Sequence, residues 1–360
     1  MALVAVLVAG GVAGSVAAEG GPSVVATAGG HRLVRRSSGL LIKRSFATPV
    51  PDRIVANTFE FNGDASPTYS YVRDPGGGLR VGMGPHGGRT FKGYFAVTLA
   101  AYPASSIFHV HMTRPPGNVT GTGHEAETVF AVQTGSTKVT GLINFVEISS
   151  DSRAGTTAWQ VGYSHGHVKN AQTRLFARSA QSAHAPLSQD ITVATDGHHH
   201  LTVWFGNRVV FHSDHLDMNM QAPFQPYLEV QSEKVPYVST FTDFWVTHDT
   251  SLTVDGLAPG SSVSLMAAAT APGTGATAAA AAPGTGGTGA AAGPPGAATP
   301  ASRPIATALA SASGQAVLWM PPPRAQGVAS LVITSPGGSS LRMGPFNYAG
   351  GDQYQLQATK

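Results

Sequence analysis

The chain has 360 residues and a formal net charge of +3, and it contains no cysteine, which excludes disulfide frameworks, thiolate metal sites and cysteine nucleophiles. Hydrophobic residues make up 42% of the sequence and can form the cores of two domains, whereas charged residues make up only 11%. The 44 glycines and 25 prolines predict many turns and few long helices. Basic residues are scattered and are not interleaved with aromatic ones, so we expect no nucleic-acid partner.

Residues 1–18 form an apolar segment rich in Ala, Val and Gly, and Val16-Ala17-Ala18 has the small-residue spacing that a signal peptidase accepts. No Lys or Arg precedes Arg32, so the basic region that usually begins a signal peptide is missing. We predict a signal peptide or an N-terminal apolar segment, and therefore a secreted, extracellular protein; an uncleaved tail or membrane anchor is the alternative. No later stretch approaches the ~20 apolar residues that span a bilayer, so no transmembrane domain is expected after cleavage.

Residues 19–50 are rich in Gly and Ser and then become locally basic, which predicts a linker. Residues 51–248 instead show short runs of β-branched and aromatic residues separated by turn residues. In one run, Phe108, Val110 and Met112 point to one side of a strand, and the residues between them point to the other. So many alternating runs predict an all-β fold, a two-sheet antiparallel sandwich.

One hairpin can be predicted in detail from the Gly206-Asn207 pair, which indicates a two-residue type II′ turn. This turn pairs Trp204 with Val209 and Thr202 with Phe211, and paired residues share a face. The predicted core face carries Leu201, Val203, Phe205 and Val210. The predicted opposite face carries His200, Thr202, Trp204, Val209 and Phe211, of which we expect His200, Thr202 and Trp204 to face solvent.

Residues 249–360 predict a second, smaller β-sandwich, because strand-like runs occur on both sides of residues 267–302. That segment contains only Ala, Gly, Pro, Ser and Thr. It cannot bury enough apolar surface to offset its ordering entropy, so we predict a disordered loop inside the sandwich. Its composition is typical of secreted bacterial proteins, which makes the Asn118-Val-Thr120 glycosylation sequon a chance match.

Three segments resemble a known superfamily. Thr195–Phe211 resembles the late hairpin of concanavalin A-like and laminin-G-like jelly rolls, and Ser239–His248 resembles their closing strand. Gly123–Phe130 lies where family 16 glycoside hydrolases, which share the fold, carry E-x-D-x-x-E. The resemblance covers residues 51–248 and implies a jelly-roll sandwich. Residues 249–360 resemble small Ig-like modules.

The resemblance also identifies the candidate catalytic residues, Glu125 and Glu127. Retaining glycosidases need two carboxyl groups, one as nucleophile and one as acid/base. The position of the last carboxylate of the motif is Phe130, whose ring cannot donate a proton. We therefore predict a non-catalytic protein that binds a carbohydrate or a cell-surface polymer. The alternatives are a divergent polysaccharide hydrolase or lyase of the family 16 type, and a structural surface or adhesion protein without a small ligand.

The candidate ligand-binding residues are Trp204, His200, Thr202, His109 and His111. An indole ring can stack on a sugar ring, although packing in a core is the alternative for Trp204 and the favoured one for Phe211 and Trp245. The pair His109-Val-His111 places two imidazoles on one face, but no motif fixes a third ligand, so no metal site is predicted. Structural calcium is compatible with such a fold, although no motif supports it. Nothing in the sequence pattern predicts an oligomeric state.

Overall fold

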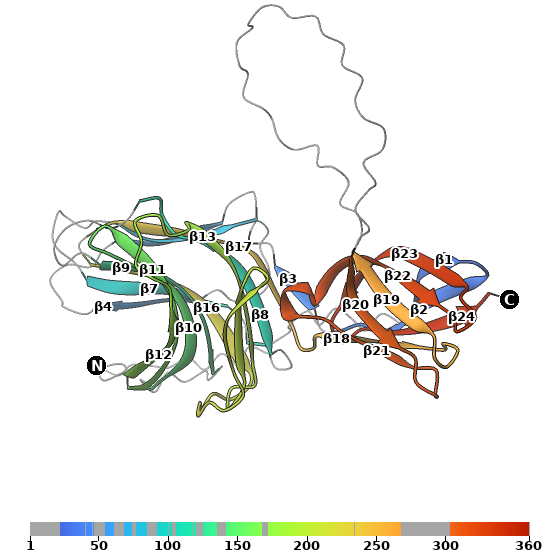
Figure 1. The fold of residues 1–360 in the computed structure, drawn as a ribbon. Helices are drawn as coiled ribbons and strands as arrows, with labels where there is room; N and C mark the ends of the chain where they lie inside the picture. The colour runs from blue at the N-terminus through green and yellow to red at the C-terminus, as the bar shows by residue number, and fades with distance from the viewer. Residues whose placement is uncertain are drawn as a thin grey trace, which may run out of the picture.

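The computed structural model describes residues 22–39, 41–44, 46, 55–60, 68–73, 77–84, 92–99, 101–102, 106–117, 119, 125–134, 142–167, 172–233, 235–267 and 303–359. The apolar segment 1–18 and all but the first residue of the segment 267–302 lie outside these residues. The strands build two β-sandwich modules that lie side by side in Figure 1. In the described part of the chain, the one helix is the 3-10 helix η2 (Pro322–Arg324), and no helix there is long and apolar enough to cross a membrane.

The first module consists of two sheets. The seven-stranded sheet has the order β12-β11-β10-β9-β16-β7-β4, and the eight-stranded sheet has the order β15-β14-β13-β8-β17-β6-β5, with β3 paired to β17. The first comprises β4 (Val55–Glu60), β7 (Lys92–Thr98), β9 (Glu125–Thr134), β10 (Leu142–Arg153), β11 (Thr156–His167), β12 (Gln172–Arg178) and β16 (Phe224–Glu233). The second comprises β3 (Leu41–Arg44), β5 (Thr68–Arg73), β6 (Leu79–Gly84), β8 (Ile107–Thr113), β13 (Ser188–Thr195), β14 (Leu201–Phe205), β15 (Arg208–Ser213) and β17 (Tyr237–Thr247). The predicted all-β, jelly-roll sandwich is confirmed.

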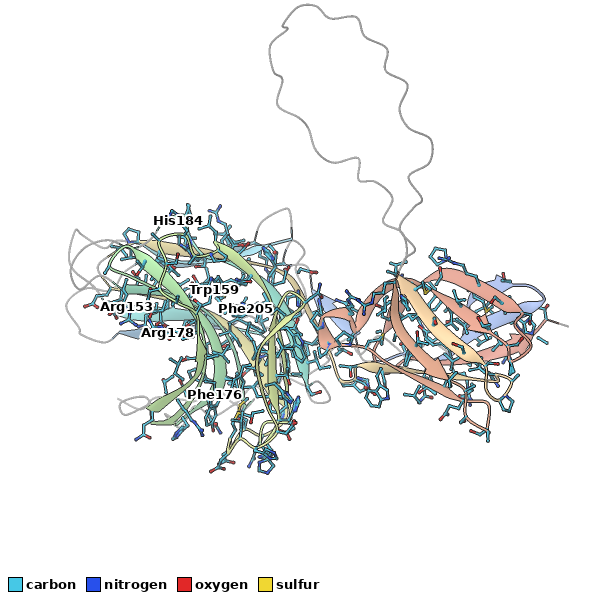
Figure 2. The ribbon with its side chains drawn as sticks, in the orientation of Figure 1. Arg153, Trp159, Phe176, Arg178, His184 and Phe205 are labelled. Atoms are coloured by element: carbon cyan, nitrogen blue, oxygen red, sulfur yellow. The ribbon has the colours of Figure 1, made fainter. Side chains whose placement is uncertain are left out.

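The core of the jelly-roll module lies between its two sheets and takes alternate residues from each strand. Phe108, Val110 and Met112 of β8 are fully buried in it, as the alternation predicts. Trp159 of β11 and Phe205 of β14 meet across the two sheets, edge to face, with ring centroids 5.7 Å apart (Figure 2). The sandwich therefore has two outer faces, one on each sheet, with the core between them.

The β14–β15 hairpin keeps the predicted register only next to its turn. A β-bulge after the second pair shifts the register by one residue, so Thr202 pairs with His212 instead of Phe211. Phe211 packs against the core side and stacks on Phe176 of β12, with ring centroids 4.8 Å apart. The prediction that Phe211 shares the outer face with Thr202 is wrong, because the bulge turns the rest of β15 over.

The predicted faces of β14 are confirmed, but the predicted solvent exposure of one face is not. Leu201 and Val203 are fully buried in the core between the sheets. Trp204 lies on the opposite face, yet it is only 8% exposed, because it packs with a small outer cluster. Thr202 is also buried and His200 is half-buried. The other members of the outer cluster are Ile107, Ala194 and Trp245.

The second module is a smaller sandwich. Its five-stranded sheet has the order β1-β2-β24-β18-β21, and its four-stranded sheet has the order β20-β19-β22-β23. The first sheet comprises β1 (Ser23–Ala28), β2 (His31–Ser37), β18 (Ser251–Asp255), β21 (Ala316–Trp319) and β24 (Gln353–Ala358). The second comprises β19 (Ser262–Ala267), β20 (Pro304–Leu309), β22 (Gln326–Thr334) and β23 (Ser340–Ala349). A kinship with Ig-like modules stays a prediction.

The prediction of a linker over residues 19–50 is wrong for residues 23–37. These residues form the β1–β2 hairpin, and β2 pairs with β24 of the C-terminal sandwich. Gly29 and Gly30 make its turn with positive φ angles of 52° and 72°, which suit a two-residue hairpin turn. Arg32 and Arg36 of β2 are exposed, while Leu33 is fully buried in the C-terminal core. The segment is therefore a strand pair despite its Gly-rich, basic composition.

The chain crosses between the two modules at two places that lie against each other. One crossing follows β2 near Gly39, and the other joins β17 to β18 near Asp249. A Cβ atom at Gly39 would lie 1.7 Å from the carbonyl oxygen of Gly350, and a Cβ at Gly350 would lie 1.7 Å from that of Asp249. Glycine at both positions lets the three backbone segments approach this closely.

Candidate functional site

The residues predicted from the sequence lie on opposite outer faces of the jelly-roll module. Glu125 and Glu127 of β9 alternate with the core residues Ala126 and Phe130, so they lie on the outer face of the seven-stranded sheet. The candidate binding residues Trp204, His200, Thr202, His109 and His111 lie on or beside the outer face of the eight-stranded sheet. The whole core separates the two sets, so the structure does not unite them in one site.

A pocket of about 630 Å³ lies on the outer face of the eight-stranded sheet. Trp204, Thr202 and His200 are part of its lining, and Thr250 and Pro322 extend the lining into the second module. Small-molecule sites typically have volumes of roughly 300–1,000 Å³ and often lie at the junction of two domains. This pocket therefore has the size and the place of a ligand site.

His109 supports the wall of this pocket but does not line it. Its ring stacks on Trp245, with centroids 4.8 Å apart and planes 11° apart, and it is buried. Trp245 belongs to the same outer cluster as Trp204, so the stack extends the packed surface on which Trp204 lies. His111 lies 2.6 Å from Asp190 and is also outside the lining. Of the five predicted binding residues, the structure brings three together at the pocket.

The sequence did not predict His212 and Asp214 as site residues. The bulge in β15 places His212 opposite Thr202, on the face that carries the pocket, and His212 is part of the pocket lining. Asp214 follows β15 directly, with one carboxylate oxygen 2.6 Å from Nδ1 of His200 and the other 3.2 Å from Nε2 of His212. The hydrogen bond with His200 and the nearby imidazoles lower the pKa of Asp214.

A second group of ionisable residues lies on the outer face of the seven-stranded sheet. Glu127 pairs directly with Asp151 of β10, while Glu229 of β16 and Glu147 of β10 pair with the next two outward-facing residues of β9. Paired residues share a face, so these carboxyl groups and Glu125 converge around one strand. A small apolar cluster lies on the same face and contains Ala96, Val129, Ala131, Tyr227 and Phe145.

Burial shifts the ionisation of three of these carboxyl groups. Burial, together with the charges of Glu147 and Asp151, raises the pKa of Glu127 to about 8. It raises the pKa of Glu147 to about 7, although a hydrogen bond with Ser164 opposes the shift. The pKa of Glu229 is also well above its ordinary value, again chiefly because of burial. Near neutral pH, Glu127 is therefore protonated.

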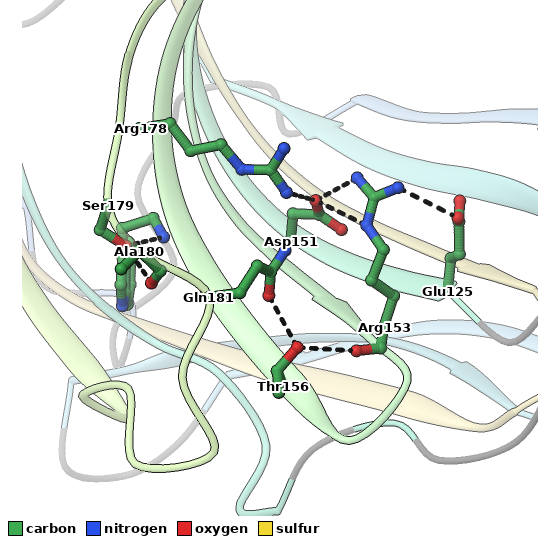
Figure 3. A network of polar contacts seen from close by, with 9 residues as sticks. Glu125, Asp151, Arg153, Thr156, Arg178, Ser179, Ala180 and Gln181 are labelled. Atoms are coloured by element: carbon green, nitrogen blue, oxygen red, sulfur yellow. Dashed lines mark hydrogen bonds and ion pairs between the residues drawn. The ribbon is translucent and has the colours of Figure 1, made fainter.

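Asp151 is held in an ion-pair network (Figure 3). Its side chain is buried, and its Oδ2 atom accepts hydrogen bonds from Arg178 at 2.9 Å and from Nε of Arg153 at 3.1 Å. Arg153 also contacts Glu125, with 3.4 Å between Nη1 and Oε1. A protonated Glu127 beside a second carboxyl group, that of Asp151, is the kind of pair that performs acid–base chemistry. However, two arginines occupy one oxygen of Asp151, and this opposes its use as a nucleophile.

Sequence reasoning missed Glu147, Asp151 and Glu229 because they lie on strands distant from Glu125 in the chain. The resemblance to family 16 identified candidate catalytic residues on β9 alone. The order of strands β10, β9 and β16 brings the carboxyl groups together, and a single sequence does not state that order. The one available signal was the spacing of Glu147 and Asp151, which places both on one face of a predicted strand.

No protein-family model and no curated protein sequence matches the chain. Among solved structures, it is similar to a glycoside hydrolase family 16 endo-glucanase from Bacteroides ovatus, with 12% identity, a TM-score of 0.39, and coverage of 57% of this chain and 98% of that one. It is also similar to the kappa-carrageenase from Pseudoalteromonas carrageenovora, with 9% identity, a TM-score of 0.30 and coverage of 56% and 96%. It is similar as well to the Emp46p carbohydrate recognition domain, with 14% identity, a TM-score of 0.35, and coverage of 50% of this chain and 86% of that one. Likenesses this distant carry no information about the activity of this chain.

Proposed function

We propose that this chain is a secreted, non-catalytic protein that binds a carbohydrate or another cell-surface polymer in the pocket of the eight-stranded sheet. The observation that carries the proposal is the pocket itself, which joins the indole of Trp204 to the polar side chains of His200 and Thr202. Sugar rings have apolar faces that pack on aromatic rings, and their hydroxyl groups need hydrogen-bond partners at the edges. Export is supported by the apolar segment 1–18.

The non-catalytic part of the proposal is supported by the state of the carboxyl groups on the other sheet. Phe130 occupies the last position of the catalytic motif and lies fully buried in the core. Glu125 and Asp151 are ion-paired with arginines, and burial keeps Glu127 protonated near neutral pH. A retaining glycosidase needs an ionised nucleophile facing a proton donor across the sugar.

A glycan array with the full chain tests the proposal, and we expect binding that Val209→Trp lowers by about tenfold or more, equivalent to ~1.4 kcal/mol. Val209 lines the pocket and is 51% exposed, so an indole there fills the pocket without disturbing the core. Titration calorimetry with the glycan found on the array measures the loss. The full chain is required, because Thr250 and Pro322 of the second module line the pocket.

The matched control for this experiment is Trp319→Ala, since Trp319 lies on β21 and is 68% exposed. Its removal should leave the affinity unchanged. Equal losses in both variants would show that binding occurs elsewhere. An array without any bound glycan would favour the third function, a structural surface or adhesion protein.

A second function, polysaccharide hydrolysis, is favoured by the pairing of Glu127 with Asp151 on the seven-stranded sheet. The proposed non-catalytic function predicts no release of reducing sugar from laminarin, agarose, xylan or xyloglucan. A reducing-sugar assay of the purified chain at pH 5 to 8 measures this. Turnover that Glu127→Gln or Glu125→Gln removes, and that Glu233→Gln retains, would replace the binding function by hydrolysis.

A further inference from the structure

The end of the β14–β15 hairpin brings together three side chains with metal-binding atoms. His200 precedes β14, His212 lies in β15 and Asp214 follows it, and one ligand atom from each lies within 4.8 Å of the others. Nδ1 of His200 and Nε2 of His212 face the two oxygens of Asp214, at 2.6 and 3.2 Å. The three side chains are partly or largely exposed, and His200 and His212 line the pocket, so an ion can reach them from solvent.

The far sides of both imidazoles converge on one hydroxyl group. Oγ1 of Thr202 lies 3.2 Å from Nε2 of His200 and 2.9 Å from Nδ1 of His212. A hydroxyl oxygen has two acceptor lone pairs, so Thr202 can accept an N–H bond from each ring. In that arrangement the nitrogens facing Asp214 are unprotonated. Thr202 is buried and holds both rings, as the outer partners of metal-binding histidines do.

In this tautomer the two nitrogens and the carboxylate can share one cation, which would replace the proton of the hydrogen bond between His200 and Asp214. In the described part of the chain, Asp214 forms ion pairs with His200 and His212, and with no Lys or Arg. Ligand bonds of about 2.0–2.1 Å to a tetrahedral ion place neighbouring ligand atoms roughly 3.3 Å apart. The contact between His212 and Asp214 already has nearly this length. The contact between His200 and Asp214 is shorter, at 2.6 Å, and a small rotation of the Asp214 side chain, just beyond the end of β15, would lengthen it.

We propose that Nδ1 of His200, Nε2 of His212 and the carboxylate of Asp214 bind one divalent transition-metal ion of the zinc class. Imidazole nitrogens favour Zn²⁺, Cu²⁺ or Ni²⁺, whereas Ca²⁺ prefers oxygen ligands alone. Three protein ligands leave a coordination position open at the rim of the pocket. The β-bulge in β15 creates the site, because it turns His212 toward Thr202. The proposal stands whether or not a glycan binds in the pocket.

Titration calorimetry with zinc chloride alone tests the site in the full chain, prepared without a histidine tag and freed of metal by chelation. We expect one ion per chain, with the affinity lowered more than about tenfold by His212→Ala or Asp214→Asn. Thr202→Val should lower it by about tenfold, because the hydroxyl positions both rings. Calcium chloride should give no binding at this site. Melting curves confirm that each variant is folded.

The matched controls are His198→Ala and His215→Ala, which remove neighbouring histidines outside the cluster and should leave zinc affinity unchanged. The affinity of the wild-type chain should also fall below pH 6, where protons compete for the imidazoles. The proposal is overturned if zinc does not bind, leaving only imidazolium–carboxylate pairs. It is equally overturned if His198→Ala abolishes binding while His212→Ala does not, since the His198–His200 tripeptide would then be the chelator.

Discussion

Replacing Leu33 by alanine is expected to lower the free energy of unfolding of the C-terminal sandwich by about 2–5 kcal/mol, the range for truncating a buried leucine. Leu33 is fully buried in that core and pairs with Leu356 of β24. Denaturant unfolding measures the effect. A Trp319→Phe background leaves indoles only in the jelly-roll module, so tryptophan fluorescence then reports that module while circular dichroism reports both.

The matched control for Leu33→Ala is Val24→Ala, because Val24 lies on the neighbouring strand β1 and is 52% exposed. We expect its effect to stay within about 0.5 kcal/mol, as for most surface substitutions. Equal effects of the two substitutions would show that the β1–β2 hairpin is not part of the C-terminal core. A loss confined to the jelly-roll fluorescence would contradict the domain assignment in the same way.

The β1–β2 hairpin shows where composition misleads. Its Gly-Gly turn and alternating residues were visible in the sequence, but the glycines and the basic side chains favoured a linker. Strand β2 can carry several charged residues because only some of its side chains, such as that of Leu33, enter the core. Its partner β24 lies at the other end of the chain, and no local pattern specifies a pairing between two such distant segments.

The β14–β15 hairpin shows how far the residue pairing at the candidate site could be predicted from the sequence. The Gly206-Asn207 turn and the alternation correctly predicted the faces of β14 and the first two residue pairs. The bulge could not be predicted, because Val209, Val210 and Phe211 are all apolar and either register buries some of them. The change of register is what brings His212 beside Thr202.

The candidate site was predictable only in part. Trp204, Thr202 and His200 were identified because they alternate on one strand. Thr250 and Pro322 also line the pocket, and their place depends on how the two modules meet rather than on any periodicity. The sequence also did not show that Glu125 and Glu127 lie on a different sheet from Trp204, because a strand pattern gives two faces but does not say which sheet the strand joins.

Replacing Glu127 by glutamine is expected to remove much of the pH dependence of jelly-roll stability and to stabilise the module at pH 9. Burial raises the pKa of Glu127 from 4.5 to about 8 in the folded chain. Below pH 4.5 the carboxyl is protonated in both states. Between pH 4.5 and about 8 the unfolded chain has released this proton while the folded chain keeps it, so stability falls over this range and levels off above it. At ~1.4 kcal/mol per pKa unit, and with neighbouring carboxyl groups sharing the effect, the loss is on the order of 2–4 kcal/mol.

Denaturant unfolding at pH 5, 7 and 9, followed by tryptophan fluorescence in the Trp319→Phe background, measures this dependence. Glutamine mimics the protonated acid, so Glu127→Gln should resemble the wild type at pH 5 and exceed its stability at pH 9. Glu125→Gln is the matched control, because Glu125 lies on the same strand face but is partly exposed and pairs with Arg153. If Glu127→Gln destabilised the module at pH 9, Glu127 would have to be an ionised, paired carboxylate. The acidic face would then hold the charged group that a glycosidase nucleophile requires, and hydrolysis would become the better explanation of this sheet.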